Sequence, residues 1–572
     1  MKRWLFREPP AGSPPRGLAR ELSISPLLLD ILWRRGLDSP EELDAYLSAR
    51  LPDLVPPSRW PQFPQAAEVI SKALLDGKKL AVWGDYDVDG ITSSTLVLDV
   101  LEAHGLDALW HVPDRRSEGY GLNIPAIEEL AAQGCGILLT VDCGISDMAA
   151  VARARELGMT VVISDHHLPP PELPPADAIC NPRLGPEDDM PCPHLAGVGV
   201  AFFLMAAVNA ALAPHTGRRF KMDKVLDLVA LGTLADVMRL GGQNRILVRG
   251  GLDKLAEAAR PGIAALKTVS GSDAAARLNA GQVVFRLAPR INAAGRMGAA
   301  DTALQLLRSK DHVEALRLAQ HLDALNTQRR EEEERIWAAA REQAHRQLEQ
   351  RQRPALVLYG GDWHPGIVGI VASRIVEEFY RPTIILCDDN NMMKGSGRSI
   401  REFDLYAGLQ KTAHVLAGFG GHKLAAGVRL EPNQLERFRE AFEQVVAEQP
   451  LTPALLLECE LDFQQASDSA FLQELELMQP FGAGNAEPVF ASPELTVVDR
   501  SPLGYSGDHV RLRLKDSASG ITLMAKGWNM ATAFPPSSVG SRIRVAYTPR
   551  LDYYRGVASI DVGIKDWQPV TD

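Results

Sequence analysis

Cysteine is scarce in this sequence. Six cysteines are spread over 572 residues, and no two of them form a CxxC pair. Disulfide-stabilised domains and thiolate zinc sites both need cysteines at short, regular spacings, so neither is expected. We predict reduced thiols and a cytoplasmic location.

Membrane and secretion signals are also missing. We find no run of about 18 apolar residues of the kind that spans a bilayer. The N-terminal stretch MKRWLFREPPAG has no apolar core and is unlike a signal peptide. A membrane is therefore not an expected partner.

Positive charge is not in excess. The formal net charge is −11, which argues against a surface coated with cations for duplex DNA. A local basic groove is still compatible with this balance, because salt screens surface charges beyond about 10 Å.

What the sequence does have is length and a globular composition. With 572 residues and 46% hydrophobic content it is too long for one core, and roughly three or four domains are expected. Shifts in pattern predict an N-terminal extension packed on the domain that follows it, an α/β domain, connecting helices that include a long exposed helix over 328–353, a smaller α/β domain and a C-terminal β-barrel. We place these five regions at residues 1–70, 71–300, 301–353, 354–450 and 451–572.

Short apolar strands alternate with amphipathic helices in the first large domain. The strands are expected at 80–84, 108–112, 136–141 and 160–164, with a helical stretch between each strand and the next. This alternation predicts a parallel sheet with helical crossovers. Ligands of such sheets bind beyond the carboxyl ends of the strands, which is where the acidic clusters of this sequence lie.

The first acidic cluster is WGDYDVDG, which has Asp85, Asp87 and Asp89 at alternate positions. A calcium loop of the EF-hand type would need an acid at its twelfth position, where this sequence has Leu96, and a helix before it, where a strand is expected. A plain polar turn needs one or two aspartates. Three close carboxylates repel one another unless a cation lies among them.

More acids and histidines follow the later apolar runs, in TVDCG, SDHH and LADV. Singly, each could cap a helix or satisfy core neighbours. Together they could hold two adjacent divalent cations, and carboxylate and imidazole ligands without thiolate favour Mn²⁺ or Mg²⁺. Two such ions catalyse phosphoester hydrolysis. These residues are Asp142, Asp165, His166, His167 and Asp236.

In their order, these motifs resemble those of the DHH phosphoesterase superfamily. GDYDVDG, TVDCG, SDHH and ALGTLADV match its catalytic domain, and RINAAGRM, KGSGRS and GGHKLAAG match the branch that carries a DHHA1 domain. The segment PFGAGNAEPVF and the β-rich tail extend the resemblance over nearly the whole chain, to the RecJ family of single-strand-specific exonucleases. The resemblance implies an α/β fold, with a parallel-sheet DHH domain and a smaller α/β DHHA1 domain joined by a long helix, and a C-terminal OB-like β-barrel.

The resemblance also implies the ligands of two Mn²⁺ or Mg²⁺ ions per active site. His167 would be a further ligand or would contact the scissile phosphate, Asp165 would orient a histidine, and the role of Asp85 is open. Family members often carry Asn where this chain has Cys143, which we do not count as a ligand. The implied ligands are Asp87, Asp89, Asp142, His166 and Asp236.

Arginines and glycines further along the chain predict contacts to a phosphodiester backbone. By resemblance, Arg115, Ser396 and Arg398 form a pocket for the terminal 5′ phosphate, which would select the end and set the direction. GGHK lacks the spacing of a Walker A loop, so binding of a nucleoside triphosphate is not expected. The full predicted phosphate and DNA set is Arg115, Arg290, Asn292, Arg296, Ser396, Arg398 and His422.

The tail alternates with period two and is rich in arginine and tyrosine. Arg511 and Arg513 share one strand face. Tyr547 and Tyr553 are candidate platforms for stacked bases, as on an OB-fold that binds single strands. An ordinary solvated strand face is the alternative interpretation.

Three functions compete. The leading one is a single-stranded-DNA-specific 5′–3′ exonuclease of recombination and repair that releases nucleoside 5′-monophosphates. It is expected to be a monomer and, by resemblance, to work with a helicase and a single-strand-binding protein. One alternative is a DHH phosphodiesterase for cyclic dinucleotides or short oligonucleotides, whose members generally lack the N-terminal segment and the β-rich tail. The other is a non-catalytic binding protein, which the intact acids and histidines disfavour.

Overall fold

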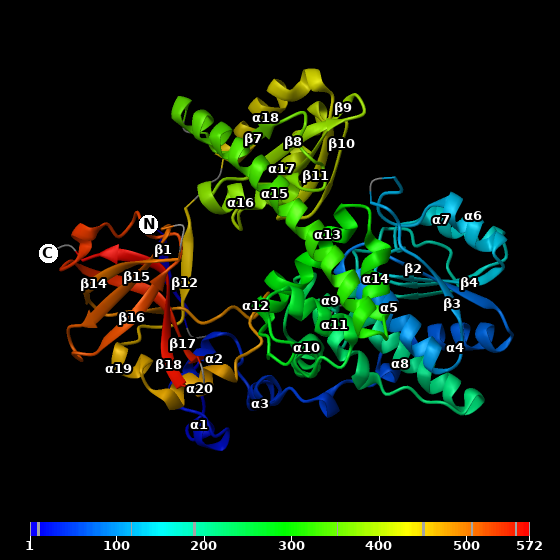
Figure 1. Cartoon of the computed structure of the whole chain (residues 1–572), viewed down its shortest axis with the longest axis horizontal. Coiled ribbons are helices and arrows are strands. Elements are labelled where there is room, and N and C mark those ends of the chain that lie inside the picture. Colours follow the sequence, from blue (N-terminus) through cyan, green and yellow to red (C-terminus); the bar gives the residue numbers. More distant parts are fainter. Residues whose placement is uncertain are drawn as a thin grey trace.

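The structure is a computed structural model, and Figure 1 shows it as three lobes. The first lobe contains residues 51–308, the second residues 355–447 and the third residues 454–569, with helix α15 running from the first lobe to the second. The described residues are 2–8, 12–115, 117–186, 190–351, 353–448, 452–504, 507–554 and 557–570.

A parallel sheet with strand order β3-β2-β4-β5-β6 forms the centre of the first lobe. Strands β2, β4 and β5 are buried on both faces, which explains why they read as continuous apolar runs, whereas the edge strand β3 is half-buried. Helices α4, α5 and α8 pack on one face, and α6 and α7 on the other. The bounds are α4 Gln62–Leu75, β2 Lys79–Gly84, α5 Val88–Ala103, β3 Ala108–His111, α6 Ile124–Ala132, β4 Cys135–Val141, α7 Met148–Glu156, β5 Thr160–Ser164, β6 Ala178–Cys180 and α8 Gly197–Thr216.

The strand order reverses between β2 and β4. Strand β3 follows β2 in sequence but lies on its outer side, whereas β4 and β5 extend the sheet in the other direction. The loops that leave β2 and β4 therefore diverge and open a crevice at the carboxyl edge. The predicted parallel sheet is confirmed, and the acidic motifs lie at this crevice.

Helix α8 corrects the sequence prediction about apolar runs. It is 20 residues long and apolar enough, by length and composition, to cross a membrane, although we had found no such run. Its most apolar window is 67% buried in the protein, against the sheet and α5. The helix is apolar all round because it is a core helix.

Helices complete the first lobe and lead out of it. Helix α15 has 39 residues, so it is about 58 Å long. Its first half packs on α11, α13 and α14, and its second half on α16 and β7. The long helix that we predicted from residue 328 thus begins at His312. The bounds are α9 Leu226–Ala235, α10 Gly242–Glu257, α11 Pro261–Val269, α12 Ala280–Gln282, the π-helical turn η5 Val283–Leu287, α13 Ala288–Arg296, α14 Ala300–Arg308 and α15 His312–Gln350.

The second lobe is a mixed sheet with strand order β10-β11-β9-β8-β7. Helices α15 and α16 cover one face, while α17 and α18 cover the other. The bounds are β7 Leu356–Tyr359, α16 Val368–Phe379, β8 Thr383–Asp389, β9 Met392–Arg398, α17 Leu405–Lys411, β10 Gly418–Gly421, β11 Ala425–Leu430 and α18 Leu435–Ala447.

The third lobe is the predicted β-barrel. Strands β14, β15, β16, β18 and β17 pair in turn, and β17 returns to β14, which closes the barrel. The bounds are β13 Phe490–Ala491, β14 Leu495–Leu503, β15 His509–Asp516, β16 Thr522–Gly527, β17 Arg542–Tyr554 and β18 Val557–Pro569.

The N-terminal segment, residues 1–70, lies only in part where we predicted. Its last part, including Trp60 and Phe63, packs on the domain that follows it, as expected. Residues 18–43 instead share a hydrophobic core with the third lobe. Strand β1 (Arg3–Phe6) pairs in parallel with β12 (Ala454–Leu457). Arg245 of α10 stacks on the ring of Tyr46 and donates to the carbonyl oxygens of Tyr46, Leu477 and Met478, which ties the first lobe to this joint unit.

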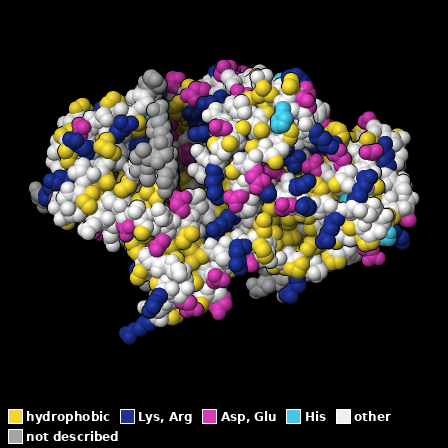
Figure 2. Space-filling model, turned by 60° about the horizontal axis from the view of Figure 1, so that its bottom comes forward, with side chains coloured by type: hydrophobic (Ala, Val, Ile, Leu, Met, Phe, Trp, Pro, Cys, Tyr) yellow, Lys and Arg dark blue, Asp and Glu magenta, His cyan; other side chains and the backbone are white. Residues whose placement is uncertain are grey.

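Charge on the outside is mixed. On the face shown in Figure 2, Lys and Arg side chains are interspersed with Asp and Glu rather than gathered in one broad area. This distribution agrees with the net charge of −11.

Candidate metal centre and phosphate pocket

The first acidic motif forms a rigid turn between β2 and α5. Asp87 is the N-cap of α5, and its Oδ1 accepts hydrogen bonds from the N–H groups of Asp89 and Gly90, at 2.8 and 3.1 Å. A Cβ at Gly90 would lie 2.4 Å from the carbonyl oxygen of Asp85, so only glycine fits there. The tight turn brings the three carboxylates of this motif to one place.

Asp89 is held by the start of α8. Its carboxylate accepts the N–H groups of Gly197 at 2.6 Å and Val198 at 2.9 Å, where the helix dipole favours negative charge. A Cβ at Gly197 would lie 2.6 Å from Oδ1 of Asp142. Because Gly197 has no side chain, the carboxylates of Asp89 and Asp142, which come from different segments, can approach each other.

Asp142 follows β4 with an unusual backbone. Its φ is +63°, the left-handed region that non-glycine residues rarely adopt. The N–H of Asp142 donates to the carbonyl oxygen of Ser164 at 2.9 Å, and the carbonyl oxygen of Asp142 accepts a hydrogen bond from the hydroxyl of Tyr120 at 3.2 Å. Both bonds fix the strained conformation, which marks a functional position.

The tripeptide Asp165-His166-His167 follows β5, and its three side chains have different roles. Oδ1 of Asp165 accepts hydrogen bonds from the N–H groups of His166 and His167 and from Nδ1 of His167, the last at 2.8 Å. Burial lowers the pKa of His167, but the Asp165 carboxylate outweighs it and raises this pKa to about 9. The predicted orienting role of Asp165 matches this geometry.

His166 points into the acidic cluster. Its Nε2 lies 3.1 Å from Asp142 Oδ1, 3.6 Å from Asp236 Oδ2 and 3.9 Å from Asp89 Oδ2. Burial, followed by the charge of His167, lowers the pKa of His166 to about 3, so the imidazole is neutral. A neutral imidazole with a free nitrogen is the form that binds metals.

Three overlapping sets of ligand atoms meet at this point, each set with its atoms within 4.8 Å of one another. Asp142 and His166 each belong to two of the sets, so the sets describe neighbouring positions rather than separate sites. Asp85, whose role was open, is a member of one. The sets are Asp142–His166–His167, Asp89–His166–Asp236 and Asp85–Asp87–Asp142.

The cluster is electrostatically incomplete without cations. Burial, with help from neighbouring carboxylates, raises the pKa values of Asp85, Asp89 and Asp142. Oδ1 of Asp85, Oδ1 of Asp142, Nε2 of His166 and Oδ2 of Asp236 are buried without hydrogen-bond partners. Unpaired buried acceptors of this kind are costly, and divalent cations would satisfy them. The residues therefore fit Mn²⁺ or Mg²⁺.

Cys143 does not take part. It is buried, and its Sγ faces the carbonyl oxygen of Trp83 at 3.7 Å. The thiol packs with the core behind the sheet edge. This placement agrees with the prediction that Cys143 is not a metal ligand.

A second cluster, of arginines, lies where the first two lobes meet. Arg115 comes from the loop after β3 and lies 5.2 Å from the ring of Tyr86; Arg296 ends α13, and Arg398 ends β9. Burial, then repulsion by Arg115, Arg329 and Arg398, lowers the pKa of Arg296 to about 10. We call these four half-buried arginines the arginine cluster; Arg329 also pairs with Glu333 at 2.9 Å. Such a concentration of positive charge favours the binding of an anion.

Ser396 and the β10–β11 turn border the arginine cluster. Nη1 of Arg398 donates to Oγ of Ser396 and to the carbonyl oxygen of Gly397, both at 2.8 Å. His422 is exposed in the turn before β11, where Ala425 pairs with Arg398. These two predicted residues are thus near Arg398.

Arg290 corrects the predicted phosphate set. Its guanidinium forms an ion pair with Asp323 at 2.7 Å and donates to the carbonyl oxygens of Arg286 and Val269. It is six residues from Arg296 on the same helix, so the two point about 120° apart. Arg290 ties α13 to α11 and α15 and does not face the arginine cluster. Asn292 is half-buried on α13.

The barrel confirms one predicted face and corrects one residue. Arg511 and Arg513 are exposed and alternate with buried residues along β15, as predicted. Tyr547 is fully buried, and its hydroxyl donates to the carbonyl oxygen of Leu461 at 2.8 Å. It is a core residue and cannot stack on a base. The side chain of Tyr553 lies outside the described residues.

Two residues of the site escaped the sequence analysis. Tyr120 donates toward Asp142, and its hydroxyl lies 3.1 Å from Nδ1 of His167. An aromatic residue between two glycines in the loop after a strand was the available signal. Arg329 joins the arginine cluster from α15, but its motif is a run of charges that looked like a solvated helix face.

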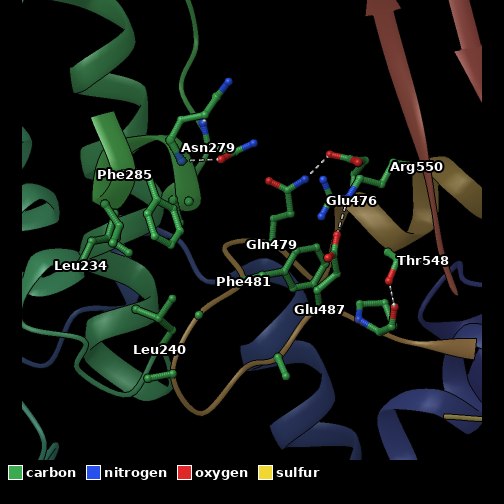
Figure 3. A pocket seen from close by; sticks show the side chains of 18 of the residues that line it. Leu234, Leu240, Asn279, Phe285, Glu476, Gln479, Phe481, Glu487, Thr548 and Arg550 are labelled. Atoms are coloured by element: carbon green, nitrogen blue, oxygen red, sulfur yellow. Dashed lines mark hydrogen bonds and ion pairs between the residues drawn. The ribbon is translucent and has the colours of Figure 1, made fainter. Parts of the chain in front are cut away.

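A cavity of about 740 Å³ opens between the first lobe and the barrel, directly beyond Asp236. Val237 and Met238 line it on one side, and Thr548 and Arg550 of β17 on the other. Figure 3 shows Phe285 of the π-helical turn and Phe481 projecting into the space, and Phe285 is 81% exposed. The cavity could accept flat apolar groups beside polar ones.

Comparisons with known proteins agree with this architecture. The model of the DHH family, N-terminal domain, matches residues 79–233, that of the DHHA1 domain residues 352–448 and that of the RecJ OB domain residues 457–566. The fold and cluster thus define a DHH-type phosphoesterase with DHHA1 and OB domains.

Relatives match along almost the whole chain. The single-stranded-DNA-specific exonuclease RecJ of Bacillus subtilis is 33% identical over 99% of this chain and 70% of its own length, and that of Escherichia coli 34% over 96% of both. The crystal structure of RecJ in complex with Mn²⁺ from Thermus thermophilus superposes with a TM-score of 0.82 at 30% identity, covering 100% of this chain and 80% of that one. A Mg²⁺ complex of the same protein is also similar. The chain belongs to the RecJ family.

Proposed function

We propose that the protein is a single-stranded-DNA-specific exonuclease that works from the 5′ end and releases nucleoside 5′-monophosphates. The observation that carries the proposal is that buried carboxylates and one neutral imidazole, from separate segments, converge with oxygen and nitrogen atoms that no protein group satisfies. We assign two Mn²⁺ or Mg²⁺ ions to this cluster. The proposed ligands are Asp85, Asp87, Asp89, Asp142, His166 and Asp236.

When bound, the cations would supply the charge that activates a water molecule and stabilises the departing oxygen. The chain keeps the ligands in place. Asp87 and Asp89 belong to the first turn of α5, and two hydrogen bonds hold the backbone of Asp142. Nδ1 of His167 is hydrogen-bonded to Oδ1 of Asp165, so Nε2 of the same ring is available to contact the scissile phosphate. A pKa of about 9 keeps this imidazole protonated at neutral pH.

The arginine cluster supports the choice of the 5′ end. A terminal phosphate carries more negative charge than an internal phosphodiester, so four nearby guanidinium groups favour it. Arg115 and Arg296 come from the first lobe, Arg398 from the second and Arg329 from the helix that joins them. A phosphate bound there would bridge the lobes and fix the 5′ nucleotide beside the metals.

The remaining strand would leave towards the barrel. The cavity beyond Asp236 offers Phe285 and Phe481 to bases, and the outer face of β15 offers Arg511 and Arg513 to the backbone. Bases can reach these surfaces only when they are unpaired. This route supports preference for single strands.

The alternative of a small-substrate phosphodiesterase is less well supported, because the curated relatives that match the whole chain, barrel included, bear the name of single-stranded-DNA-specific exonuclease. We propose that the protein acts on DNA in the cytoplasm as a monomer, in recombination and repair. A helicase and a single-strand-binding protein would supply and protect the strand.

Digestion of end-labelled DNA tests the proposal. Single strands and duplexes labelled at either end are incubated with Mn²⁺, Mg²⁺ or a chelator, and the products are separated by size. The 5′ label should appear at once as a mononucleotide, only from single strands and only with metal. Release of the 3′ label first, or equal attack on blunt duplexes, would contradict it.

A further inference from the structure

Gly369 lies where α16 meets the proposed phosphate pocket. It is buried in the first turn of α16 and faces β9. A Cβ built on Gly369 would lie 2.8 Å from Oγ of Ser396 and 3.0 Å from Nη2 of Arg398. These are the two residues that the second lobe contributes to the pocket, and the helix reaches both because it has no side chain here.

The backbone does not require glycine at this position. Gly369 is helical and has no positive φ, so alanine could adopt the same conformation. Glycine weakens a helix relative to alanine, so a helical glycine needs another reason. Here the reason is space, because Oγ of Ser396 and the Arg398 guanidinium occupy the volume that a methyl group would fill.

Arg398 has little freedom to move away. Its Nη1 is bound on the strand side by Oγ of Ser396 and the carbonyl oxygen of Gly397, both at 2.8 Å. Gly369 is at the other side of the guanidinium, next to Nη2. A methyl group would push on the guanidinium and on the hydroxyl that orients it.

The turn that leads into α16 also contacts the first lobe. Nη1 of Arg296 donates to the carbonyl oxygen of Gly366 at 2.6 Å, three residues before Gly369. Gly366 lies in the turn that leads into α16, so this turn and the start of the helix together contact an arginine from each lobe. Arg296 donates to the carbonyl oxygen of Gly366, and Arg398 lies beside the space that a side chain at Gly369 would fill. The relative position of the two guanidinium groups depends on this turn.

We propose that Gly369 is a positioning residue that sets Ser396 and Arg398 for the terminal 5′ phosphate, and thereby sets the preference of the enzyme for 5′-phosphorylated ends. The inference rests on the proposed function, because it takes the anion of the arginine cluster to be that phosphate. Gly369 acts only through its two neighbours and touches no metal ligand.

The test compares two substrates that differ in one group. Single-turnover rates are measured on the same oligonucleotide with a 5′ phosphate and with a 5′ hydroxyl, for the unchanged protein, Gly369→Ala and Gly418→Ala. Gly418→Ala is the matched control in the same lobe, because a Cβ there meets nothing within 4 Å. Gly369→Ala should lower the phosphate-to-hydroxyl rate ratio about 10–100-fold, the range expected for displaced positioning groups, whereas Gly418→Ala should keep it.

Two further measurements distinguish a positioning role of Gly369 from a general loss of structure in the variant. In a background that carries both Ser396→Ala and Arg398→Ala, adding Gly369→Ala should change the ratio by less than about twofold, because both affected groups are already gone. The shift in melting temperature caused by Mn²⁺ should be equal in Gly369→Ala and the unchanged protein, which shows that the metal cluster is intact.

The outcomes are distinct. If Gly369→Ala leaves the ratio unchanged, or lowers both rates equally, or lowers the ratio as strongly in the Ser396→Ala/Arg398→Ala background, the inference is wrong while the pocket stands. If the unchanged protein shows no preference for a 5′ phosphate, the pocket itself is wrong, and the proposed 5′ selection fails with it.

Discussion

Nε2 of His166 lies 3.1 Å from Oδ1 of Asp142, and neither atom has a hydrogen-bond partner among the described residues. Two buried polar atoms this close would normally form a bond or separate. The surrounding turns prevent both, because Asp142 is held by its backbone and His166 by the loop after β5. The pair is preorganised for a cation rather than for each other.

Asp142→Asn should therefore separate activity from stability. The amide keeps the shape but removes a charge that is shared between two ligand sets, so nuclease activity with Mn²⁺ should fall about 10³-fold or more, since metal-bound charge is worth several kcal/mol in the transition state. In chelator the variant should melt higher than the unchanged protein, because repulsion among carboxylates is relieved. Asp107→Asn, at an exposed position in the loop before β3, is a control that should alter neither. A variant that keeps full activity would remove Asp142 from the site.

The metal-free protein should lose stability as pH rises. Burial raises the pKa values of Asp85, Asp89 and Asp142, and raises that of Asp236 to about 7. A carboxyl group whose pKa is higher in the folded state stabilises the fold below its unfolded pKa of about 4, and this contribution disappears as pH rises through the folded value.

Melting in chelator should thus decline between pH 6 and pH 8, and the rise in melting temperature on adding Mn²⁺ should be larger at pH 8. The decline should be smaller in Asp142→Asn, which has one titrating group fewer. A Mn²⁺ effect that is constant over this range, in a protein that binds the metal throughout, would count against the proposed ligand set.

Strand ends were the part of the site that the sequence could reveal. Asp87, Asp142 and His166 follow different strands, and the ends of neighbouring parallel strands meet at one edge, so their convergence follows from local patterns. The side of a helix or barrel strand is harder to assign. Tyr547 has the same parity as Ile543 and Val545, both buried, and belongs to the barrel interior for that reason.

Long-range partners were beyond the sequence. Nothing near Leu28 or Leu32 indicates that their helix packs against the barrel, more than 400 residues away. Arg290 is in a motif that matches the family, yet only the packing of α13 shows that it pairs with Asp323. Local periodicity gives elements and edges, whereas contacts between distant elements depend on the whole fold.

Asp165→Asn should impair the reaction without emptying the cluster. Losing the carboxylate lowers the pKa of His167 from about 9 towards its usual value and leaves Nδ1 poorly oriented. We expect kcat to fall about 10–100-fold, as for other groups that orient a site from behind. The alkaline limb of the pH–rate profile should move to lower pH.

Tyr120→Phe is the companion measurement. It removes the hydroxyl near Nδ1 of His167 but keeps the carboxylate, so the rate should fall less and the alkaline limb should stay in place. A profile that is unchanged in Asp165→Asn would show that protonated His167 has no role in the rate.

The barrel offers a direct contrast between an exposed arginine pair and a buried tyrosine. Replacing Arg511 and Arg513 together by alanine should weaken binding of long single strands and reduce the salt dependence of log K by about 1.4, since each phosphate contact on a single strand contributes about 0.7. Cleavage of a very short oligonucleotide, which cannot reach the barrel, should be unchanged.

Tyr547→Phe should leave the salt dependence intact and cost about 1 kcal/mol of stability, because it only removes the hydrogen bond to Leu461. Fluorescence titration over a range of salt concentrations, with thermal melting of both variants, decides the matter. Weaker DNA binding by Tyr547→Phe at unchanged stability would mean that this ring reaches the strand after all.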